Sequence, residues 1–261
     1  MSNYSITSLY SGSKGNSVLI ESRRAKILID AGKSAKALCL ALEGIGKSID
    51  EIDAIFITHE HTDHISALEV LLKKHKIPIH AVRATANKML CKGLSPHEAL
   101  MCIHSPLYSV EIGDMLITSF DTPHDSEYSV GYRIEICEGD EKSVIGYATD
   151  IGYVTDKIKL ALSGCESIVL ECNHDVEMLM NGPYPHDLKL RIKSNRGHLS
   201  NEACAELASE LCVEGTKNIL LAHLSEENND PTLAFDTVWS AIADESINLR
   251  VASQYEAVRL I

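Results

Sequence analysis

Apolar positions fall along the chain in short runs that predict strands. Each run is rich in Ile, Val or Leu and is bounded by polar or turn-forming residues. The runs cover residues 16–21, 26–30, 54–58, 115–120, 130–137, 143–148, 167–170 and 218–222. Some neighbouring runs are close enough to form hairpins and others are separated by helical patterns. We therefore expect layers of an α+β or α/β fold.

Two segments have the spacing of amphipathic helices. Ile65, Leu68 and Leu71 fall on one face of a helix that we expect to run from residue 64 to residue 76. A second helix is expected after Ser200, a favourable N-cap, with apolar residues every four positions and Gly215 as its stop. The chain has no low-complexity tract, repeat or Pro/Ser-rich linker, so we expect a single domain over residues 1–261.

The composition is that of an ordinary globular protein with an excess of acidic residues. The chain has 261 residues, of which 45% are hydrophobic, and its 24 Lys and Arg against 37 Asp and Glu give a formal net charge of −13. These values exclude a collagen, a coiled coil and a small disulfide-rich protein. The negative charge disfavours non-specific binding of nucleic acid or anionic membrane over the whole surface, but it does not exclude a local basic groove.

The cysteines and the amino terminus bear on redox state and location. None of the eight cysteines has the C-x-x-C or C-x-C spacing of a zinc ribbon or a thioredoxin-type dithiol. The amino terminus has no basic start followed by an apolar signal segment, and no later stretch reaches the about 20 apolar residues of a membrane span. We therefore expect a cytoplasmic protein without a membrane partner.

Several predicted strands end in a residue that can bind a metal ion or transfer a proton. These residues are Asp30, His59, Asp150, Glu171 and His223. Polar residues commonly close strands, so each case alone is weak. Because strands that share one core can bring their ends to a common edge, the five together predict a functional site at that edge.

Residues 59–64, which read HEHTDH, supply four potential metal ligands directly after a predicted strand. Alternate side chains of an extended chain share a face, so we expect His59, His61 and Asp63 to point the same way. His64 would approach from the start of the following helix. A single tetrahedral ion rarely needs four ligands so close in sequence, so this segment predicts two neighbouring cations.

This H-x-H-x-D-H motif resembles the signature of the metallo-β-lactamase superfamily of hydrolases, and the resemblance extends over nearly the whole chain. It implies an α+β fold, the αβ/βα four-layer sandwich, with a dinuclear metal site at one edge of two packed sheets. The implied ligands are His59, His61 and His124 for one metal, Asp63, His64 and His223 for the second, and Asp150 as the bridging carboxylate. The resemblance also implies that Asp30, which is not itself a ligand, stabilises the metal-binding loop.

The donor set implied by this resemblance has five imidazoles and two carboxylates and no thiolate. Such a set suits Zn²⁺, Mn²⁺ or iron, and ligand type alone does not choose among them. Two ions about 3.5–4 Å apart can clamp both oxygens of an in-line displacement and generate hydroxide near neutral pH, which favours phosphodiester cleavage. Asp150 stands where thiol-ligand β-lactamases would have Cys, and this disfavours antibiotic hydrolysis.

Three further segments indicate which branch of the superfamily the chain resembles. Residues 10–17 form a glycine-rich loop between the first two strands, either a plain hairpin turn or an anion site offered by Ser13, Lys14 and Asn16. Residues 171–175, which read ECNHD, follow another strand. Residues 189–196 have four cations, including Lys193 and Arg196, and no acid. Together these segments resemble the YycJ/WalJ-type exonucleases.

This closer resemblance implies a nuclease that acts on DNA from the 5′ end of a duplex. By analogy with the tRNA 3′-end processing nucleases, His198 would be the general acid, oriented by Glu171, with Asp63 in the catalytic group. His198 can instead cap the helix after it, and the basic residues can form a solvated face rather than a phosphate site. Two other functions stay open: a phosphodiesterase acting on a small cyclic phosphate, and a metal-binding protein without turnover.

Overall fold

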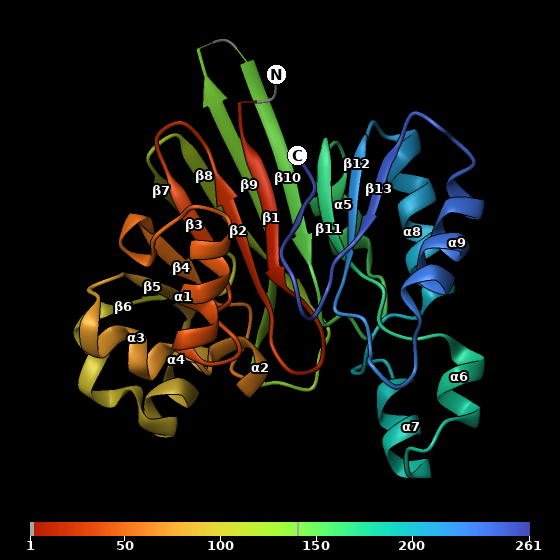
Figure 1. Cartoon of the computed structure of the whole chain (residues 1–261), viewed down its shortest axis with the longest axis horizontal. Coiled ribbons are helices and arrows are strands. Elements are labelled where there is room, and N and C mark those ends of the chain that lie inside the picture. The colour runs from red at the N-terminus through yellow and green to blue at the C-terminus, as the bar shows by residue number, and fades with distance from the viewer. Residues whose placement is uncertain (1–2, 140) are drawn as a thin grey trace.

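Two facing sheets form the centre of the protein, and helices cover the outer side of each sheet (Figure 1). The computed structural model describes residues 3–139 and 141–261. In this part of the chain each sheet has seven strands. The layers run helix, sheet, sheet, helix, which confirms the predicted α+β four-layer sandwich.

The first sheet comes mainly from the amino-terminal part of the chain, and its strand order is β14-β1-β2-β3-β4-β5-β6. The strands are β1 (Ser5–Tyr10), β2 (Ser17–Glu21), β3 (Lys26–Ile29), β4 (Ala54–Phe56), β5 (Ile79–Val82), β6 (Met101–His104) and β14 (Val258–Arg259). Strands β3 to β6 are parallel, so their carboxyl ends lie at one edge of the sheet.

The second sheet has the order β13-β12-β11-β10-β9-β8-β7. Its strands are β7 (Ser109–Ile112), β8 (Met115–Thr122), β9 (Ser129–Glu138), β10 (Glu141–Ala148), β11 (Ser167–Glu171), β12 (Asn218–Ala222) and β13 (Asn248–Val251). Strands β10 to β13 are parallel and also share one edge at their carboxyl ends.

Helices occupy the two outer layers and the region beyond the strand ends (Figure 1). The first sheet is covered by α1 (Ala35–Gly44), α3 (Leu68–Lys74) and α4 (Arg83–Met89), and the second by α5 (Asp156–Leu162), α8 (Asn201–Val213) and α9 (Pro231–Ile242). Beyond the strand ends lie α2 (Thr62–Ile65), α6 (Val176–Asn181) and α7 (His186–Ile192). Short 3₁₀ helices span Ile49–Glu51 and Ser95–Leu100, and a π-helical turn spans Leu90–Leu94. Within the described ranges, every helix is too short or too polar to cross a membrane.

Apolar side chains fill the space between the sheets and the space under each helix layer. Between the sheets, Ile29, Phe56, Tyr132, Tyr147 and Leu220 are buried. Separate apolar clusters join each sheet to its covering helices. The strands are therefore packed on both faces, which fixes the positions of the residues that follow their carboxyl ends.

The single helix expected over residues 64–76 is wrong, because the structure divides it into α2 and α3. Loops at the strand ends take the hydrogen bonds that would have continued the helix. The Ala67 N–H donates to the Ala31 carbonyl, and the Asp63 carbonyl accepts from the Asn16 N–H at 2.8 Å. The His64 carbonyl accepts from the Ala31 N–H, also at 2.8 Å. These tertiary bonds hold α2 against the edge of the first sheet.

Candidate metal centre

Residues that follow three of the parallel strands meet at one edge of the sandwich. Asp30 follows β3, Asp150 lies after β10 and His223 follows β12. All three have left-handed backbone conformations, with φ of 61°, 59° and 61°. This region is uncommon for residues other than Gly, and such residues cluster at functional sites. The chain thus turns sharply at the strand ends, and the three side chains all lie near His64 or each other.

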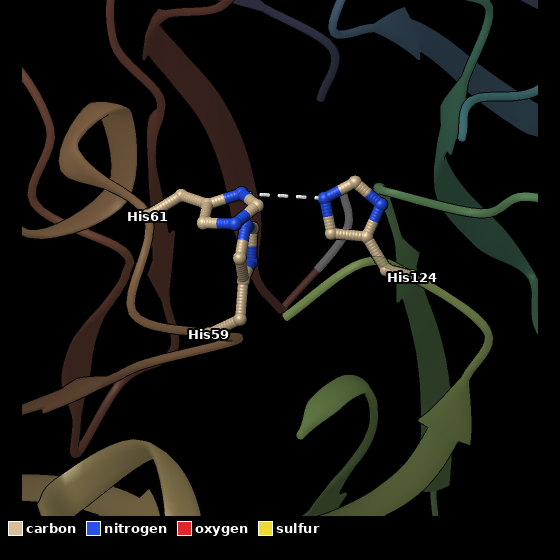
Figure 2. Close-up of side chains that lie close together, drawn as sticks. All are labelled: His59, His61 and His124. Carbon is tan, nitrogen blue, oxygen red and sulfur yellow. Dashed lines mark hydrogen bonds between the residues drawn. The ribbon is translucent and has the colours of Figure 1, made fainter. Parts of the chain in front are cut away.

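The first group of side chains contains the imidazoles of His59, His61 and His124, which converge from the loops after β4 and β8 (Figure 2). One nitrogen of each ring lies within 4.8 Å of the others. His61 Nδ1 is 3.3 Å from His124 Nε2, and His124 Nδ1 is 3.0 Å from the Gly197 carbonyl. Nδ1 must donate to that carbonyl, which leaves Nε2 of the neutral ring as an acceptor that faces His61.

The second group contains Asp63, His64 and His223. Asp63 Oδ2 lies 3.2 Å from His64 Nε2 and 3.5 Å from His223 Nε2. The expectation that Asp63 shares a face with His59 and His61 by strand alternation is wrong. Asp63 lies in the first turn of α2, where the two-residue period of an extended chain no longer holds.

Asp150 lies between the two groups and is almost fully buried. Its Oδ1 is 3.6 Å from His124 Nε2 and 3.6 Å from His223 Nε2. Its Oδ2 is 3.4 Å from His64 Nε2. One carboxylate therefore faces imidazoles of both groups, and we call Asp150 together with the two groups the carboxylate–histidine cluster.

Asp30 supports this cluster from the side of the first sheet. Its carboxylate accepts from Thr58 N–H and from Thr58 Oγ1, both at 2.9 Å, and Oδ2 lies 2.8 Å from His64 Nδ1. His64 Nδ1–H therefore donates to Asp30, and the opposite nitrogen, Nε2, faces Asp63 and Asp150. Carboxylates commonly fix the orientation and tautomer of metal-binding histidines in this way.

Several buried atoms of the cluster lack hydrogen-bond partners among the residues that the structure describes. They are His59 Nε2, Asp150 Oδ2 and His223 Nε2, and each belongs to a buried side chain. An unsatisfied buried polar atom is costly and calls for an ion or a water molecule. Divalent cations fit these positions, because the free atoms are lone-pair donors of the types that Zn²⁺, Mn²⁺ and iron accept.

The charges of the cluster also favour a cation. Burial raises the pKa of Asp150, but the imidazoles of His223 and His64 outweigh burial and hold this pKa well below its usual value. Burial lowers the pKa of His223, but Asp150 and Asp63 outweigh burial and raise it to about 10. The ionised carboxylates thus draw positive charge into the site. Divalent ions can supply that charge in place of the imidazole protons.

His198 and Glu171 form a pair beside the cluster. His198 Nδ1 is 2.8 Å from Glu171 Oε1, while Glu171 Oε2 accepts from the N–H groups of Ile151 at 2.7 Å and Leu199 at 3.0 Å. Burial raises the pKa of Glu171, but the His198 imidazole outweighs it and the pKa falls to about 2. The helix after His198 is capped by Ser200, whose hydroxyl accepts from the Ala203 N–H. Capping therefore does not account for His198.

A cavity of about 350 Å³ opens over these residues and is lined by side chains of both groups, by Asp150 and by His198. Of the loop residues expected to bind substrate, Ser13 lines this cavity. Lys14 lies at the exposed rim and forms an ion pair of 2.5 Å with Glu226. Asn16 is 1% exposed and donates to Asp63 Oδ2 at 3.2 Å, so its position favours a supporting role over the expected substrate contact.

The basic segment lies along the rim of the site, but its cations differ in their partners. Lys189 donates to the Met180 carbonyl and Arg191 forms an ion pair with Asp125. Arg196 donates to the carbonyl of His124 at 3.1 Å and remains exposed. Lys193 is exposed and lines a second cavity next to His198.

Three residues near the ligands were not predicted from the sequence. Thr58 holds Asp30, Asp125 lies 3.3 Å from His124 Nε2, and Asn173 donates to the His223 carbonyl at 2.8 Å. Thr58 and Asp125 are each next to a predicted ligand in the chain, and Asn173 lies within residues 171–175. Their position in the chain could have drawn attention to them, but their contacts depend on the fold.

A family profile described as "Beta-lactamase superfamily domain" matches residues 25–223, a span that contains both groups of the cluster together with Asp30, Asp150 and His198. The chain belongs to the metallo-β-lactamase superfamily. The fold and the resemblance predicted from the sequence are thereby confirmed.

Two relatives within this superfamily are similar over most of the chain. Exodeoxyribonuclease WalJ of Streptococcus pneumoniae is 38% identical over 95% of this chain and 91% of its own length. Exodeoxyribonuclease YycJ of Bacillus anthracis is 34% identical over 92% of this chain and 90% of its own length. The resemblance to the YycJ/WalJ-type branch is therefore confirmed.

The fold is shared with more distant members of the superfamily. The Zn²⁺-bound PqqB of Methylobacterium extorquens superimposes with a TM-score of 0.69 over 97% of this chain and 99% of its own, at 14% sequence identity. At this identity the likeness concerns the fold alone. It shows that the superfamily member described here has the same arrangement of sheets and helices as that protein.

Proposed function

We propose that this chain is a metal-dependent phosphodiesterase that acts as a 5′-to-3′ exonuclease on duplex DNA. The proposal rests chiefly on one observation: the His198–Glu171 pair borders the same cavity as the carboxylate–histidine cluster, whose buried atoms lack partners in the described part of the chain. The names of the two relatives, both exodeoxyribonucleases, support DNA as the substrate. The proposal includes the cytoplasmic location expected from the amino terminus.

Two divalent ions, Zn²⁺ or Mn²⁺ with iron as a further candidate, would be held by the cluster. His59, His61 and His124 would hold one, Asp63, His64 and His223 the other, and Asp150 would contact both. When bound, such ions polarise a phosphodiester and lower the pKa of bound water toward neutrality. Asp30 and Asn16 would keep His64 and Asp63 in orientation through the bonds described above.

His198 would act as the general acid for the leaving oxygen. Hydrolysis breaks the bond between phosphorus and the 3′ oxygen, water supplies the new oxygen on phosphorus, and the 3′ oxygen takes up a proton. The Glu171 carboxylate accepts from Nδ1–H of His198, which fixes the ring and leaves Nε2 for this transfer. Glu171 is itself held by two backbone N–H groups, so the pair is rigid.

The DNA backbone would be bound at the rim of the site. Lys193 and Arg196 are exposed cations close to His198 and His124, and Ser13 and Lys14 lie on the opposite loop. Because the net charge is −13, contact with phosphates would be confined to this rim. We therefore expect a shallow dependence of DNA binding on salt concentration, with few phosphates neutralised.

The experiment that tests this function is incubation of metal-assayed protein with duplexes labelled at the 5′ or the 3′ end. We expect labelled mononucleotides to be released early from the 5′-labelled duplex and late from the 3′-labelled one, with Zn²⁺ or Mn²⁺ present. Intact duplexes together with hydrolysis of bis(p-nitrophenyl) phosphate or a cyclic nucleotide would instead indicate a small-molecule phosphodiesterase. Full metal occupancy without hydrolysis of any of these substrates would indicate a binding protein.

A further inference from the structure

A second cavity, of about 410 Å³, begins at His198 and extends away from the carboxylate–histidine cluster. Among the described residues, His198 is the one that lines both this second cavity and the cavity over the cluster. No residue of the cluster lines the second cavity. Its volume is in the range of about 300–1,000 Å³ that small-molecule sites occupy.

The second cavity combines apolar walls with a few polar groups. Val154, Leu199 and Leu207 supply apolar surface, and the ring of Tyr153 is 47% exposed beside them. His174 also lines the cavity; it is 1% exposed, and its Nδ1 has no hydrogen-bond partner among the described residues. An aromatic ring over apolar walls, with an unsatisfied ring nitrogen, fits a flat heterocycle that carries hydrogen-bonding groups.

Charged side chains stand at the rim of the second cavity. Lys193 and Lys159 are the cations in its lining and Glu206 is the acid. Lys159 is already paired with Glu210 at 2.5 Å, which leaves Lys193 as the more available partner for an anion. This arrangement suits a ligand with a neutral ring system and one phosphate group.

We propose that the second cavity binds the 5′-terminal nucleoside of the cleaved strand. This inference rests on the proposed exonuclease function and deepens it. The oxygen that leaves phosphorus is the 3′ oxygen of the nucleoside on the 5′ side, and it must lie against His198 to receive a proton. Because the second cavity starts at His198, the sugar that carries this oxygen lies at its mouth and the base lies inside, against Tyr153.

The size of the second cavity then determines where the enzyme cuts. A space of this volume receives one unpaired nucleoside but no base pair, so only a strand end can enter it. The terminal nucleotide departs from the 5′ end with a free 3′ hydroxyl, and the shortened strand keeps the phosphate at the cluster. The product is a mononucleotide, and the direction of digestion is 5′ to 3′.

The chain connects the second cavity rigidly to the cluster. Tyr153 lies three residues after Asp150, and the Gly152 between them packs against the backbone of Asn195. A Cβ at residue 152 would lie 2.3 Å from the Asn195 carbonyl carbon. Glycine is therefore required there, and the close approach fixes Tyr153 relative to the segment that carries Lys193.

The test uses the metal-loaded full chain and two readouts: binding of deoxyadenosine 5′-monophosphate by calorimetry, and mononucleotide release from a 5′-labelled duplex. Ala203 lines the second cavity, so Ala203→Phe fills it, whereas Ala241→Phe makes the same change at an exposed position on α9. We expect Ala203→Phe to weaken binding and slow release at least about tenfold, and Ala241→Phe to stay within about twofold.

A second variant does not depend on packing in α8. Tyr153→Ala removes an exposed ring, so the fold is retained, and the loss of stacking should weaken nucleotide binding about tenfold. Tyr153→Phe keeps an aromatic ring and should retain most of the nucleotide affinity. In the wild type, deoxyribose 5-phosphate, which lacks a base, should bind at least about tenfold more weakly than deoxyadenosine 5′-monophosphate.

Two results would overturn the inference: equal nucleotide affinity in Ala203→Phe and Ala241→Phe, or equal affinity of the wild type for the two phosphates. Failure of the proposed function looks different. In that case the wild type would release no mononucleotide from any duplex, while nucleotide binding would still respond to Ala203→Phe.

Discussion

Two histidine clusters in this protein have the same side chains in different surroundings. In the carboxylate–histidine cluster each group of imidazoles meets at least one ionised carboxylate. At the edge of the first sheet, His80 and His104 instead stack flat, with ring centroids 5.2 Å apart, between Phe56 and Tyr108. We call this second arrangement the stacked pair.

The comparison shows what separates a candidate metal site from a packed core. In the stacked pair the imidazoles hydrogen-bond to each other, with His80 Nδ1 3.1 Å from His104 Nε2. Burial and then the neighbouring ring of His104 lower the pKa of His80 to about 4. For His223 the carboxylates overcome burial and the pKa moves in the opposite direction. The rings of the stacked pair thus satisfy each other, whereas His59 Nε2 and His223 Nε2 in the carboxylate–histidine cluster have no partner among the described residues and can bind an ion.

Removal of one imidazole ring from each cluster should have very different effects on hydrolysis. His61→Ala should lower duplex hydrolysis by about a thousandfold, because it removes a ligand of the ions that stabilise the developing charge. The side chain is 30% exposed, so the fold should survive. His80→Phe, which keeps the stack on Phe56, should retain activity within about twofold. Initial rates and thermal midpoints measure both effects, and full activity in His61→Ala would refute the assignment of the cluster.

His198→Ala tests the proton donor next to the cluster. Loss of a general acid should lower hydrolysis of duplex DNA about a hundredfold. The rate of bis(p-nitrophenyl) phosphate hydrolysis should fall much less, because p-nitrophenolate leaves without protonation. The ratio of the two rates, measured against wild type, is the readout. An equal loss on both substrates would show that His198 does not act as the acid.

The stacked pair should make the free energy of unfolding depend on pH in the acid range. Between about pH 6.5 and pH 4, His80 is protonated in the unfolded chain but stays neutral in the folded chain. Its contribution to the free energy of unfolding is therefore fully present above pH 6.5 and is lost as the pH falls through this window. At pH 5 the loss attributable to His80 should be about 2 kcal/mol. Urea denaturation at pH 7.5 and pH 5 should show a smaller acid loss in His80→Phe. An identical loss in both proteins would rule out His80 as its source.

The smallest expected effect concerns the support of the cluster. Asp30→Asn keeps the shape of the side chain but removes the charge that holds His64, so metal affinity should fall about tenfold. Asp50→Asn is the matched control, because Asp50 lies 2.6 Å from His75 Nδ1 at the surface, away from the cluster. Metal affinities from competition with a chelator of known affinity decide the case. An unchanged metal affinity in Asp30→Asn would show that Asp30 does not support the metal ligands.

Much of the fold followed from the sequence because the central strands have long apolar runs. The eight predicted strands are all present, with ends shifted by at most two residues. Among the described residues, the strands outside the eight predicted ranges are β1, β5, β6, β7, β13 and β14. Strands β5 and β6 are each four residues long and contain a histidine of the stacked pair, which interrupts or ends the apolar run. The division between α2 and α3 was also missed, because it depends on backbone bonds from Ala31 and Asn16, which lie far away in the chain.

The candidate site was predictable where its residues form a motif and not where only the fold brings them together. The structure places the predicted ligands in one cluster, while their role as ligands stays a prediction. Asp125 is the neighbour of His124 in the chain, so only its adjacency to a predicted ligand indicates it. The bond from Asn173 to the His223 carbonyl joins segments far apart in sequence, so no local pattern indicates that contact. Asn16 shows the reverse difficulty, because a loop residue that suggests substrate contact is buried against Asp63.

We propose that the carboxylate–histidine cluster, and not the stacked pair, holds two divalent ions. The most direct test is a Zn²⁺ titration of chelator-treated protein, with bound metal counted per chain by elemental analysis. We expect two ions per chain in the wild type and in His80→Phe, and about one in His61→Ala. A wild-type protein that binds one ion or none, or a His80→Phe variant that loses one, would contradict it.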